Sequence, residues 1–547
     1  MSSYEPDPAR PPGDSTPTEP APVEPTTGEP TPGEPTPAEA VAAPVDPAAP
    51  DEAAPPRHRR GPVIWGLVAL AVVALALTAA AFGMKLVGGG PQPDTLVPST
   101  ALAYLRVDTD PSIGQKVSAV RFLQKVPQVK GALDSGDPRK RLVDALIERS
   151  GTKDLSYTRD IEPWLGDRLA FALLPPKSEG AEPEPLLVVQ VKDEAKARAG
   201  IARLSADNTD KPEVTFKDGY ALLTSAGNGK AVTDAIAKAT LADTTTYAGD
   251  VAAVGDQGIA SGWLDLGGMA KAGAFKDAAD SGKLSVNPFG SGPDLQGTGR
   301  VAFALRFDAD AVELVGVSRG ATGLKKPATT AGSTITRLPA DTAVALSVSG
   351  LDQVVGQAWG GILKGISAQS PGQDVDGELK AMESQLGISL PGDLQTLLGR
   401  NLVLAVPDQD FASGNAPQFG ARVTTDATKA DAVVTRLERL AIQTGAELPI
   451  VHQARGDQFY LASSRDYLGK LSADGTLGDS AAFTAAVPDV KDAQYVLFAD
   501  LDRLEKSYLD QVPAQDRELV RSLRAVGASG SVTGNGEARF TLRVVGN

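Results

Sequence analysis

The chain of 547 residues has few side chains of the types that carry out nucleophilic or metal-based catalysis. It contains no Cys and only two His residues, His58 in a basic cluster and His452 before a predicted turn. A Ser–His–Asp triad would have to use His452, and no Gly-x-Ser-x-Gly motif supplies a nucleophile. Metal sites would rest on carboxylates, which suit Ca²⁺ or Mg²⁺. We interpret His452 as a strand surface residue and predict no catalytic, cofactor-binding or metal-binding residue.

Three short motifs suggest other chemistry. Residues 150–153, Ser-Gly-Thr-Lys, match the Ser-x-x-Lys motif of penicillin-binding acyl enzymes, but the partner motifs Ser-Asp-Asn and Lys-Thr-Gly are missing and a helix end is favoured. Residues 227–230, Gly-Asn-Gly-Lys, resemble half a phosphate loop without its first Gly. Residues 374–378, Asp-Val-Asp-Gly-Glu, lack the spacing of a Ca²⁺ loop and are typical of a helix start. A pair of carboxylates that hydrolyses glycosides stays an open alternative, because Asp and Glu are plentiful.

The first structural element that the sequence predicts is an apolar, charge-free run at residues 63–82 (Val63 to Phe82). A helix of that length spans the ~30 Å hydrocarbon core of a bilayer. A basic cluster at residues 57–60 precedes the run and Lys85 alone follows it, which predicts a cytoplasmic N-terminus. A cleaved secretory signal and a buried soluble helix are the alternatives, but the run is long for a signal and has no polar face. We predict a transmembrane helix over residues 62–86, with the lipid bilayer as its partner.

Residues 1–61 predict a disordered cytoplasmic tail rich in Pro, Glu and Thr. Proline at this density removes backbone donors, and few large apolar side chains are available for burial. The tail is either a docking strip for proline-recognising partners, with Thr phosphorylation sites, or a solvated spacer. Residues 1–56 hold eleven acidic residues and one basic residue, and the whole chain has a net charge of −15. We therefore expect no nucleic-acid partner.

The remainder of the chain contains an internal repeat. The sequence of residues 164–173 (WLGDRLAFAL) returns 233 positions later at residues 397–406 (LLGRNLVLAV). A period of this length indicates a duplicated domain rather than a solenoid. We predict two extracytoplasmic domains, at residues 94–319 and 334–547, with a linker at 320–333.

Each copy has a mixed pattern of helices and strands. In the first copy the spacing of apolar residues predicts strands over 186–192, 213–216 and 220–224, and helices over 193–206 and 229–239. Residues 301–307 alternate between apolar and other side chains. Residues 537–544 alternate throughout, so one face of that strand must meet water.

Three aspartates suit helix N-caps. Asp426 precedes a helix predicted over 426–443, and Asp265 and Asp500 occupy corresponding strand-to-helix junctions in the two copies. The predicted fold class is α+β: a disordered tail, one transmembrane helix, and two tandem duplicated domains of antiparallel sheet plus helices.

Two motifs carry a resemblance to a known family. One is the strand opening Val97-Pro98-x-x-Ala101-x-x-Tyr104-Leu105, and the other is Ile-Glu-Pro-Trp-Leu-Gly-Asp at residues 161–167. With the apolar run after the Pro-rich tail, the chain resembles an actinobacterial family of single-pass membrane proteins with a domain of unknown function. The resemblance covers most of residues 94–547 and implies no activity. The second copy has Leu397 in place of Trp164 and Arg400 in place of Asp167, so a role tied to those residues would belong to the first copy.

These features favour a membrane-anchored, extracytoplasmic binding or interaction protein of the bacterial cell envelope without catalytic activity. The first alternative is an extracytoplasmic carrier of an apolar, lipid-like ligand, held in a cavity between helices and a curved sheet. Phe171, Phe303 and Trp263 would suit such a cavity but are equally ordinary core residues. The second alternative is a carboxylate-based envelope hydrolase. The expected partner besides the bilayer is an envelope protein or an apolar ligand.

Overall fold

The computed structural model describes residues 91–125, 156–273, 299–321 and 332–547, with gaps at 179, 207–209, 309, 370–371, 412–415, 447, 515–516 and 535. The predicted tail, His58, the run at 63–82, the motif at 150–153 and most of the linker fall outside these residues. Within them, every helix is too short or too polar to cross a membrane. The predicted fold class, which included a transmembrane helix, is corrected accordingly: the described fold is α+β, built on one large antiparallel sheet.

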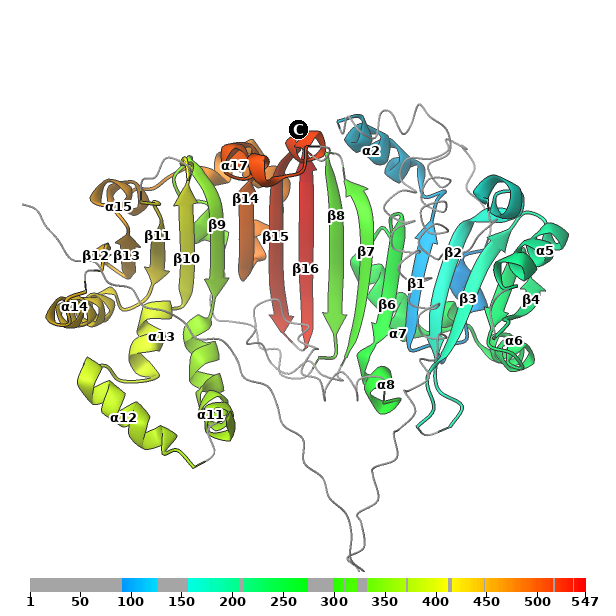
Figure 1. Cartoon of the computed structure of the whole chain (residues 1–547), viewed down its shortest axis with the longest axis horizontal. Helices are drawn as coiled ribbons and strands as arrows, with labels where there is room; N and C mark the ends of the chain where they lie inside the picture. The colour runs from blue at the N-terminus through cyan, green and yellow to red at the C-terminus, as the bar shows by residue number, and fades with distance from the viewer. Residues whose placement is uncertain are drawn as a thin grey trace, which may run out of the picture. The chain divides into compact units, whose positions relative to one another are not determined.

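Sixteen strands form this sheet (Figure 1). The first copy supplies β1 (Ala103–Asp108), β2 (Leu165–Leu174), β3 (Glu184–Val191), β4 (Glu213–Lys217), β5 (Tyr220–Thr224), β6 (Ala260–Asp265), β7 (Arg300–Asp308) and β8 (Ala311–Arg319). The second copy supplies β9 (Thr342–Ser349), β10 (Asn401–Pro407), β11 (Gly420–Thr424), β12 (Val451–Arg455), β13 (Gln458–Ala462), β14 (Tyr495–Asp500), β15 (Leu523–Gly534) and β16 (Glu537–Gly546).

The strand order is the same in both halves of the sheet. From the outer edge inward it is β4-β5-β3-β2-β1-β6-β7-β8 in the first copy and β12-β13-β11-β10-β9-β14-β15-β16 in the second. The halves meet where β8 pairs with β16, with Val315 opposite Thr541. The last strand of each copy therefore hydrogen-bonds to the last strand of the other, and the sheet is continuous across both.

Helices and short 3-10 or π turns join the strands. In the first copy they are η1 (Pro93–Leu96), α2 (Ile113–Gln124), η2 (Tyr157–Ile161), α5 (Glu194–Leu204), α6 (Gly229–Lys238), η3 (Leu241–Asp243), α7 (Thr245–Val254) and α8 (Leu266–Lys271). In the second they are α10 (Gly332–Ile335), α11 (Leu351–Gln369), α12 (Val375–Leu386), α13 (Gly392–Leu398), α14 (Ala427–Gln443), α15 (Arg465–Ser472), η4 (Leu477–Asp479), α16 (Ala481–Ala486), η5 (Val490–Asp492), α17 (Leu501–Tyr508), η6 (Leu509–Gln511) and α18 (Arg517–Arg521).

The predicted local elements are confirmed where the structure describes them. The hairpin of β4 and β5, the helices α5, α6 and α14, and the alternating strands β7 and β16 lie within two residues of their predicted bounds. The N-cap predictions are also confirmed. The carboxylates of Asp426, Asp265 and Asp500 accept hydrogen bonds from the backbone N–H groups of Lys429, Gly268 and Arg503 at 3.2, 2.9 and 3.2 Å.

The two faces of the sheet differ in their covering. The back face carries the two largest cores, which pack against α6, α7 and η3 in the first copy and against α15, α16 and η4 in the second. The front face is covered near its ends, where α5 and η2 pack on β3 and β5, and α14 packs on β11 and β13. In addition, α2 packs on the front face at the end of β7, through Phe122 against Phe307.

The Pro-Trp-Leu-Gly-Asp motif holds α5 on the front face. The indole of Trp164 is buried, and its Nε1 donates to the carbonyl of Asp160 at 2.6 Å. Gly200 of α5 lies against this indole, and a Cβ there would come closer to Nε1 than van der Waals contact allows. In the second copy Leu397, which replaces Trp164, packs at the edge of the smaller core beneath α14. Packing thus explains the tryptophan of the motif.

Gly200→Ala should reduce the free energy of unfolding by about 2 kcal/mol, because the added methyl overpacks the contact between α5 and Trp164. Urea unfolding of the full chain measures the loss. Gly360→Ala is the matched control, because Gly360 of the exposed helix α11 has no atom within 4 Å of the new methyl. It should stabilise by up to about 1 kcal/mol through helix propensity. Equal stability of the two variants would contradict the contact.

Candidate functional site

A charge-free apolar surface crosses the middle of the front face. The register places one row of side chains directly opposite one another over seven neighbouring strands, from β10 to β7. The row consists of Leu404, Leu346, Leu497, Ala528, Leu542, Leu314 and Leu305. Leu404, Leu497 and Leu542 are 42, 39 and 38% exposed, and the other four are half-buried. Large aliphatic side chains this exposed in a continuous row mark a binding surface more often than scattered ones do.

A second apolar row runs parallel to the first on the same strands. It consists of Leu402, Val348, Tyr495, Gly530, Phe540, Gly316 and Phe303. Phe540 covers Gly316 and Phe303 covers the next glycine, Gly262 of β6, so closely that a Cβ on either glycine would clash with the ring. A Cβ on Gly530 would lie 3.3 Å from Cδ2 of Tyr495, which is tight but not a clash. Each ring therefore lies over the neighbouring strand and fills the gap that a glycine leaves.

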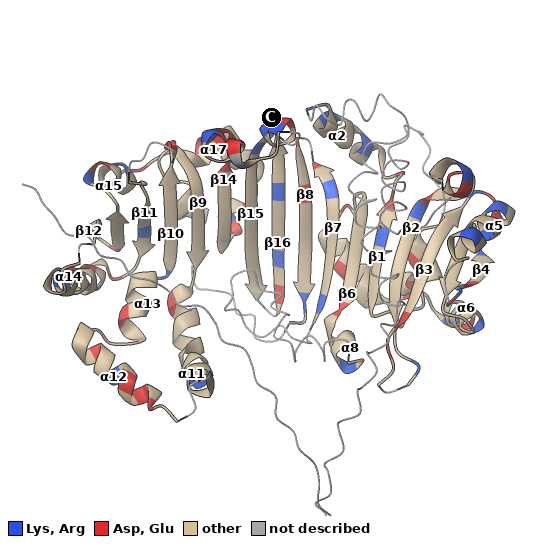
Figure 2. Ribbon diagram, viewed as in Figure 1, with Lys and Arg blue, Asp and Glu red and all other residues tan. Residues whose placement is uncertain are grey.

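We call these fourteen residues the central strip. Strands lie ~4.8 Å apart, so seven of them span roughly 30 Å across the sheet. Figure 2 shows that β9 and β10 carry no charged residue along their whole length. None of the fourteen side chains is charged, and the only polar group among them is the hydroxyl of Tyr495.

The alternation of β16 runs opposite to the usual arrangement at this surface. Two of its polar residues, Arg543 and Thr541, are 8 and 6% exposed, whereas Phe540 and Leu542 are 40 and 38% exposed. The sequence predicted that one face of this strand meets water, and in the structure that face is the apolar one. An exposed apolar face combined with buried charge is costly for folding, and it is the kind of departure that indicates a functional surface.

A network of charged side chains on the back face makes this arrangement possible. Nη1 of Arg543 donates to Asp308 Oδ2 at 2.8 Å and to Glu313 Oε2 at 3.0 Å. Nε of Arg306 donates to Glu313 Oε1 at 2.7 Å. Glu313 is thus held between two guanidinium groups at the junction of β7, β8 and β16. Buried charges of this kind are tolerated only when they are paired and hydrogen-bonded.

Helices stand on the front face on either side of the central strip. The row through Leu402 continues on the same face to Val423 and Phe459, which α14 covers through Ala430 and Val434. The row through Leu305 continues to the strands under α5. Figure 1 shows the middle strands lying between α14 and α5. Helices on the same face thus flank the strip on both sides.

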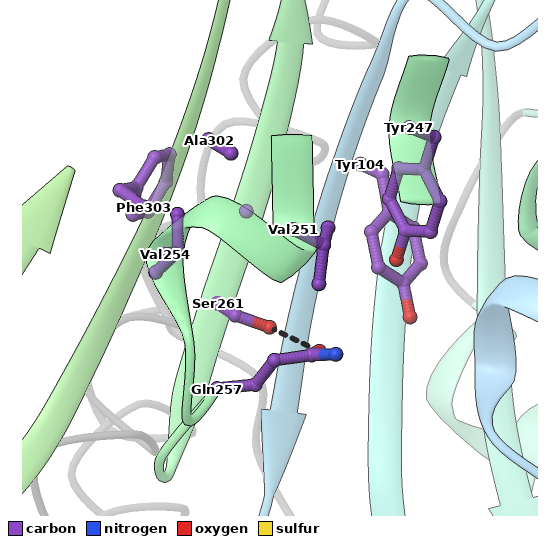
Figure 3. Close-up of a pocket in the computed structure, with 9 residues that line it drawn as sticks. Tyr104, Tyr247, Val251, Val254, Gln257, Ser261, Ala302 and Phe303 are labelled. Carbon is purple, nitrogen blue, oxygen red and sulfur yellow. Dashed lines mark hydrogen bonds between the residues drawn. The ribbon is translucent and has the colours of Figure 1, made fainter. Parts of the chain in front are cut away.

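The back face has a small cavity in the first copy and a larger open cleft of about 700 Å³ in the second, where Arg337, Asp479 and Lys491 are among the lining residues. A cavity of about 10 Å³ lies beneath α7, lined by Tyr104, Tyr247, Gln257 and Ser261 among others (Figure 3). This volume holds one water molecule. The hydroxyl of Tyr104 is buried without a partner, and Gln257 accepts a hydrogen bond from Ser261 at 3.1 Å. Such a cavity suits a structural water rather than a carried ligand.

The residues that the sequence singled out for chemistry do not come together. His452 lies on β12, where its Nδ1 is 2.9 Å from Asp431 Oδ1 and its Nε2 is 3.2 Å from Glu438 Oε2. Both carboxylates belong to α14, so His452 ties this helix to the edge strand. Asp374 caps α12 by accepting from the N–H of Gly377 at 3.0 Å. In the described ranges no three metal-binding side chains form a cluster.

The glycine-rich turn before α6 is also held by protein contacts. The N–H of Gly229 donates to Glu213 Oε2 at 3.0 Å, and the amide of Asn228 donates to Glu184 Oε2 at 2.7 Å. Carboxylates therefore occupy the donors that a phosphate loop would direct at its ligand.

A buried carboxylate beneath α5 gives the fold a pH dependence. The side chain of Asp160 is fully buried. It accepts hydrogen bonds from Arg159 Nε at 3.0 Å, Ser156 N at 2.9 Å and Arg203 Nη1 at 2.8 Å. These bonds, that of Arg159 above all, outweigh burial and lower the pKa of Asp160 well below its ordinary value of 3.8.

Because the folded pKa lies below the unfolded one, Asp160 contributes stability that is fully present above about pH 4 and lost as the pH falls through the folded pKa. Asp160→Asn should therefore unfold at lower urea than wild type at pH 7, and the gap should narrow at pH 3. Asp234→Asn is the control, because Asp234 is exposed and pairs only with Lys230 one helical turn away. A gap that is constant with pH would contradict the role of the ionised carboxylate.

Comparison with known proteins gives a family and no relative of known activity. A family model described as "Protein of unknown function (DUF3352)" matches residues 63–544. Neither a curated protein nor a solved structure matches the chain. The family match covers both copies of the repeat and every strand of the sheet except the last residues of β16. The chain therefore belongs to the DUF3352 family of proteins of unknown function.

Proposed function

We propose that this chain is a non-enzymatic binding protein that takes up an apolar partner on the central strip. The observation that supports the proposal is the inverted strand β16, which presents Phe540 and Leu542 to solvent while Arg543 is buried. If β16 faced the other way, Phe540 and Leu542 would be buried and Arg543 could stay hydrated. The charged network would then not have to lose its water on folding. A binding role for the apolar side of β16 explains why this side faces solvent despite that cost.

The form of the site differs from the cavity that a carrier would have between helices and sheet. The back-face cavity beneath α7 is too small for anything larger than water, and the larger cleft of the second copy is lined in part by the charged residues Arg337, Asp479 and Lys491. The central strip is free of charge and open to solvent. The ligand surface in this proposal is therefore the central strip itself. An extracytoplasmic position in an actinobacterial cell envelope stays a prediction from the sequence.

A neutral, polarity-sensitive dye tests the proposal. Wild-type protein should enhance the fluorescence of Nile red, and the double variant Leu404→Glu/Leu497→Glu should reduce the enhancement at least about threefold, since a charge next to the dye must be desolvated. Both positions are about 40% exposed, so the new carboxylates can stay hydrated and folding should persist, as circular dichroism would show.

Ile362→Glu is the matched control. Ile362 is 41% exposed, as much as Leu404, but it lies on α11 away from the central strip. It should keep the dye enhancement. If Ile362→Glu and the double variant lower it equally, or if neither does, the central strip is not the binding surface.

A further inference from the structure

We propose that the apolar partner is a single diacyl lipid, whose two acyl chains lie on the central strip. The inference rests on the proposed function and names the ligand class of the same surface. It is carried by three properties of the strip: its near-absence of hydrogen-bonding side chains, the aromatic rings that fill its glycine hollows, and the helices on either side.

The strip offers a polar partner a single hydrogen-bonding side chain, Tyr495. Thirteen of its fourteen side chains have no donor or acceptor, and the backbone groups of these seven strands are engaged by neighbours on both sides. A protein interface of ordinary quality forms about one hydrogen bond per 100–200 Å² and is enriched in Arg, Tyr and Trp. An acyl chain needs no hydrogen bond. The near-absence of polar groups over roughly 30 Å thus matches hydrocarbon better than a protein surface.

The relief of the strip argues against a docked helix. Helices pack by fitting ridges of side chains into grooves of the partner. The rings of Phe540 and Phe303 fill the hollows over Gly316 on the strip and over Gly262 on the adjacent strand β6, and Tyr495 lies against Gly530. These rings occupy hollows into which the ridges of a docked helix would otherwise fit, whereas a flexible acyl chain can follow the surface without them.

The flanking helices argue for one extracted lipid rather than a bilayer surface. Elements α5 and α14 stand on the same face as the strip, and α2 packs over the end of β7. A planar membrane would meet these helices ~10 Å before it reached the strip. The two leaflets of a bilayer make up a core of ~30 Å, so one acyl chain is ~15 Å long. The strip therefore has the length of two chains end to end.

Lipid loading of the full chain tests this inference. The protein is incubated with phosphatidylglycerol vesicles, separated from them, and analysed by native mass spectrometry. We expect one adduct of diacyl-lipid mass per chain in wild type and in Ile362→Glu. Leu404→Glu/Leu497→Glu and Leu542→Glu should lower the bound fraction at least tenfold. A phosphatidylglycerol with a diazirine in one acyl chain should cross-link to peptides of β9, β14 and β16.

The possible results distinguish failure of the lipid inference from failure of the proposed function. Loss of Nile red binding in the strip variants without any lipid adduct in wild type would overturn the lipid and leave the apolar surface standing. Binding of palmitate alone would overturn the diacyl ligand. A dimer in light scattering that the strip variants dissociate would make a second copy the occupant. An adduct that survives Leu404→Glu/Leu497→Glu would place the lipid elsewhere and overturn the inference.

Discussion

Replacement of Arg543 by Ala should lower the free energy of unfolding by about 3 kcal/mol at pH 7. The guanidinium is bonded to Glu313 and Asp308, and Glu313 is 4% exposed. Removal of one member of a buried ion pair costs roughly 3–5 kcal/mol, because it leaves the partner charge without compensation in the interior. We expect the lower end of this range, since Arg306 still binds Glu313 in the variant. Urea unfolding of the full chain measures the change.

Arg539→Ala is the control on the same strand and the same face. Nη1 of Arg539 donates to a neutral acceptor, the carbonyl of Ala253, at 3.0 Å. Its loss should cost about 1 kcal/mol, the usual contribution of one hydrogen bond. If Arg543→Ala is no more destabilising than Arg539→Ala, the buried charge network does not hold β7, β8 and β16 together.

The second large effect concerns the aromatic residue at the centre of each back-face core. Trp263 donates from Nε1 to Asp250 Oδ2 at 3.0 Å and meets Tyr247 edge to face, with ring centroids 5.8 Å apart. Phe498, at the corresponding place in the second copy, meets Phe483 at 5.1 Å. Trp263→Ala and Phe498→Ala should each cost about 3–5 kcal/mol through the cavity they leave.

Both variants should move one and the same unfolding transition. The two copies are joined by eight residue pairs between β8 and β16, so neither half can unfold without exposing the paired edge of the other. Calorimetry of the full chain should show a single peak for the sheet that shifts down in both variants. Two peaks, of which Trp263→Ala shifts one and Phe498→Ala the other, would show that the copies unfold separately.

The sequence predicted local elements well because local signals are sufficient for them. The apolar stripe and Asp426 define α14, and the Lys-Asp-Gly turn defines the hairpin of β4 and β5. The joining of the two halves through β8 and β16 has no local signal, because it depends on which strand edge is left open after each copy folds. The carboxylates that bind His452 were missed for the same reason, since they come from a helix that precedes it.

The central strip could not be predicted from alternation alone. Residues 537–544 alternate in the same way whichever face is buried, since a period of two distinguishes two faces without assigning the core to either. The usual assignment would have buried Phe540 and Leu542. Only the tertiary pairing of Arg543 with Glu313 and Asp308 reverses it. The sequence did contain one signal for this arrangement. Three charged residues of neighbouring strands pair directly across the sheet on one face, namely Arg306, Glu313 and Arg543.

The junction of β8 with β16 also bears on how the protein avoids self-aggregation. Unpaired strand edges are the places where sheets add to one another without limit. The junction leaves β4 and β12 as the outermost strands, and each has five residues and ends in a charged one, Lys217 or Arg455. Short, charged edges resist extension by another chain. A broad apolar area can therefore stay open without promoting fibrils, because growth into fibrils requires a strand edge and this area lies away from both edges.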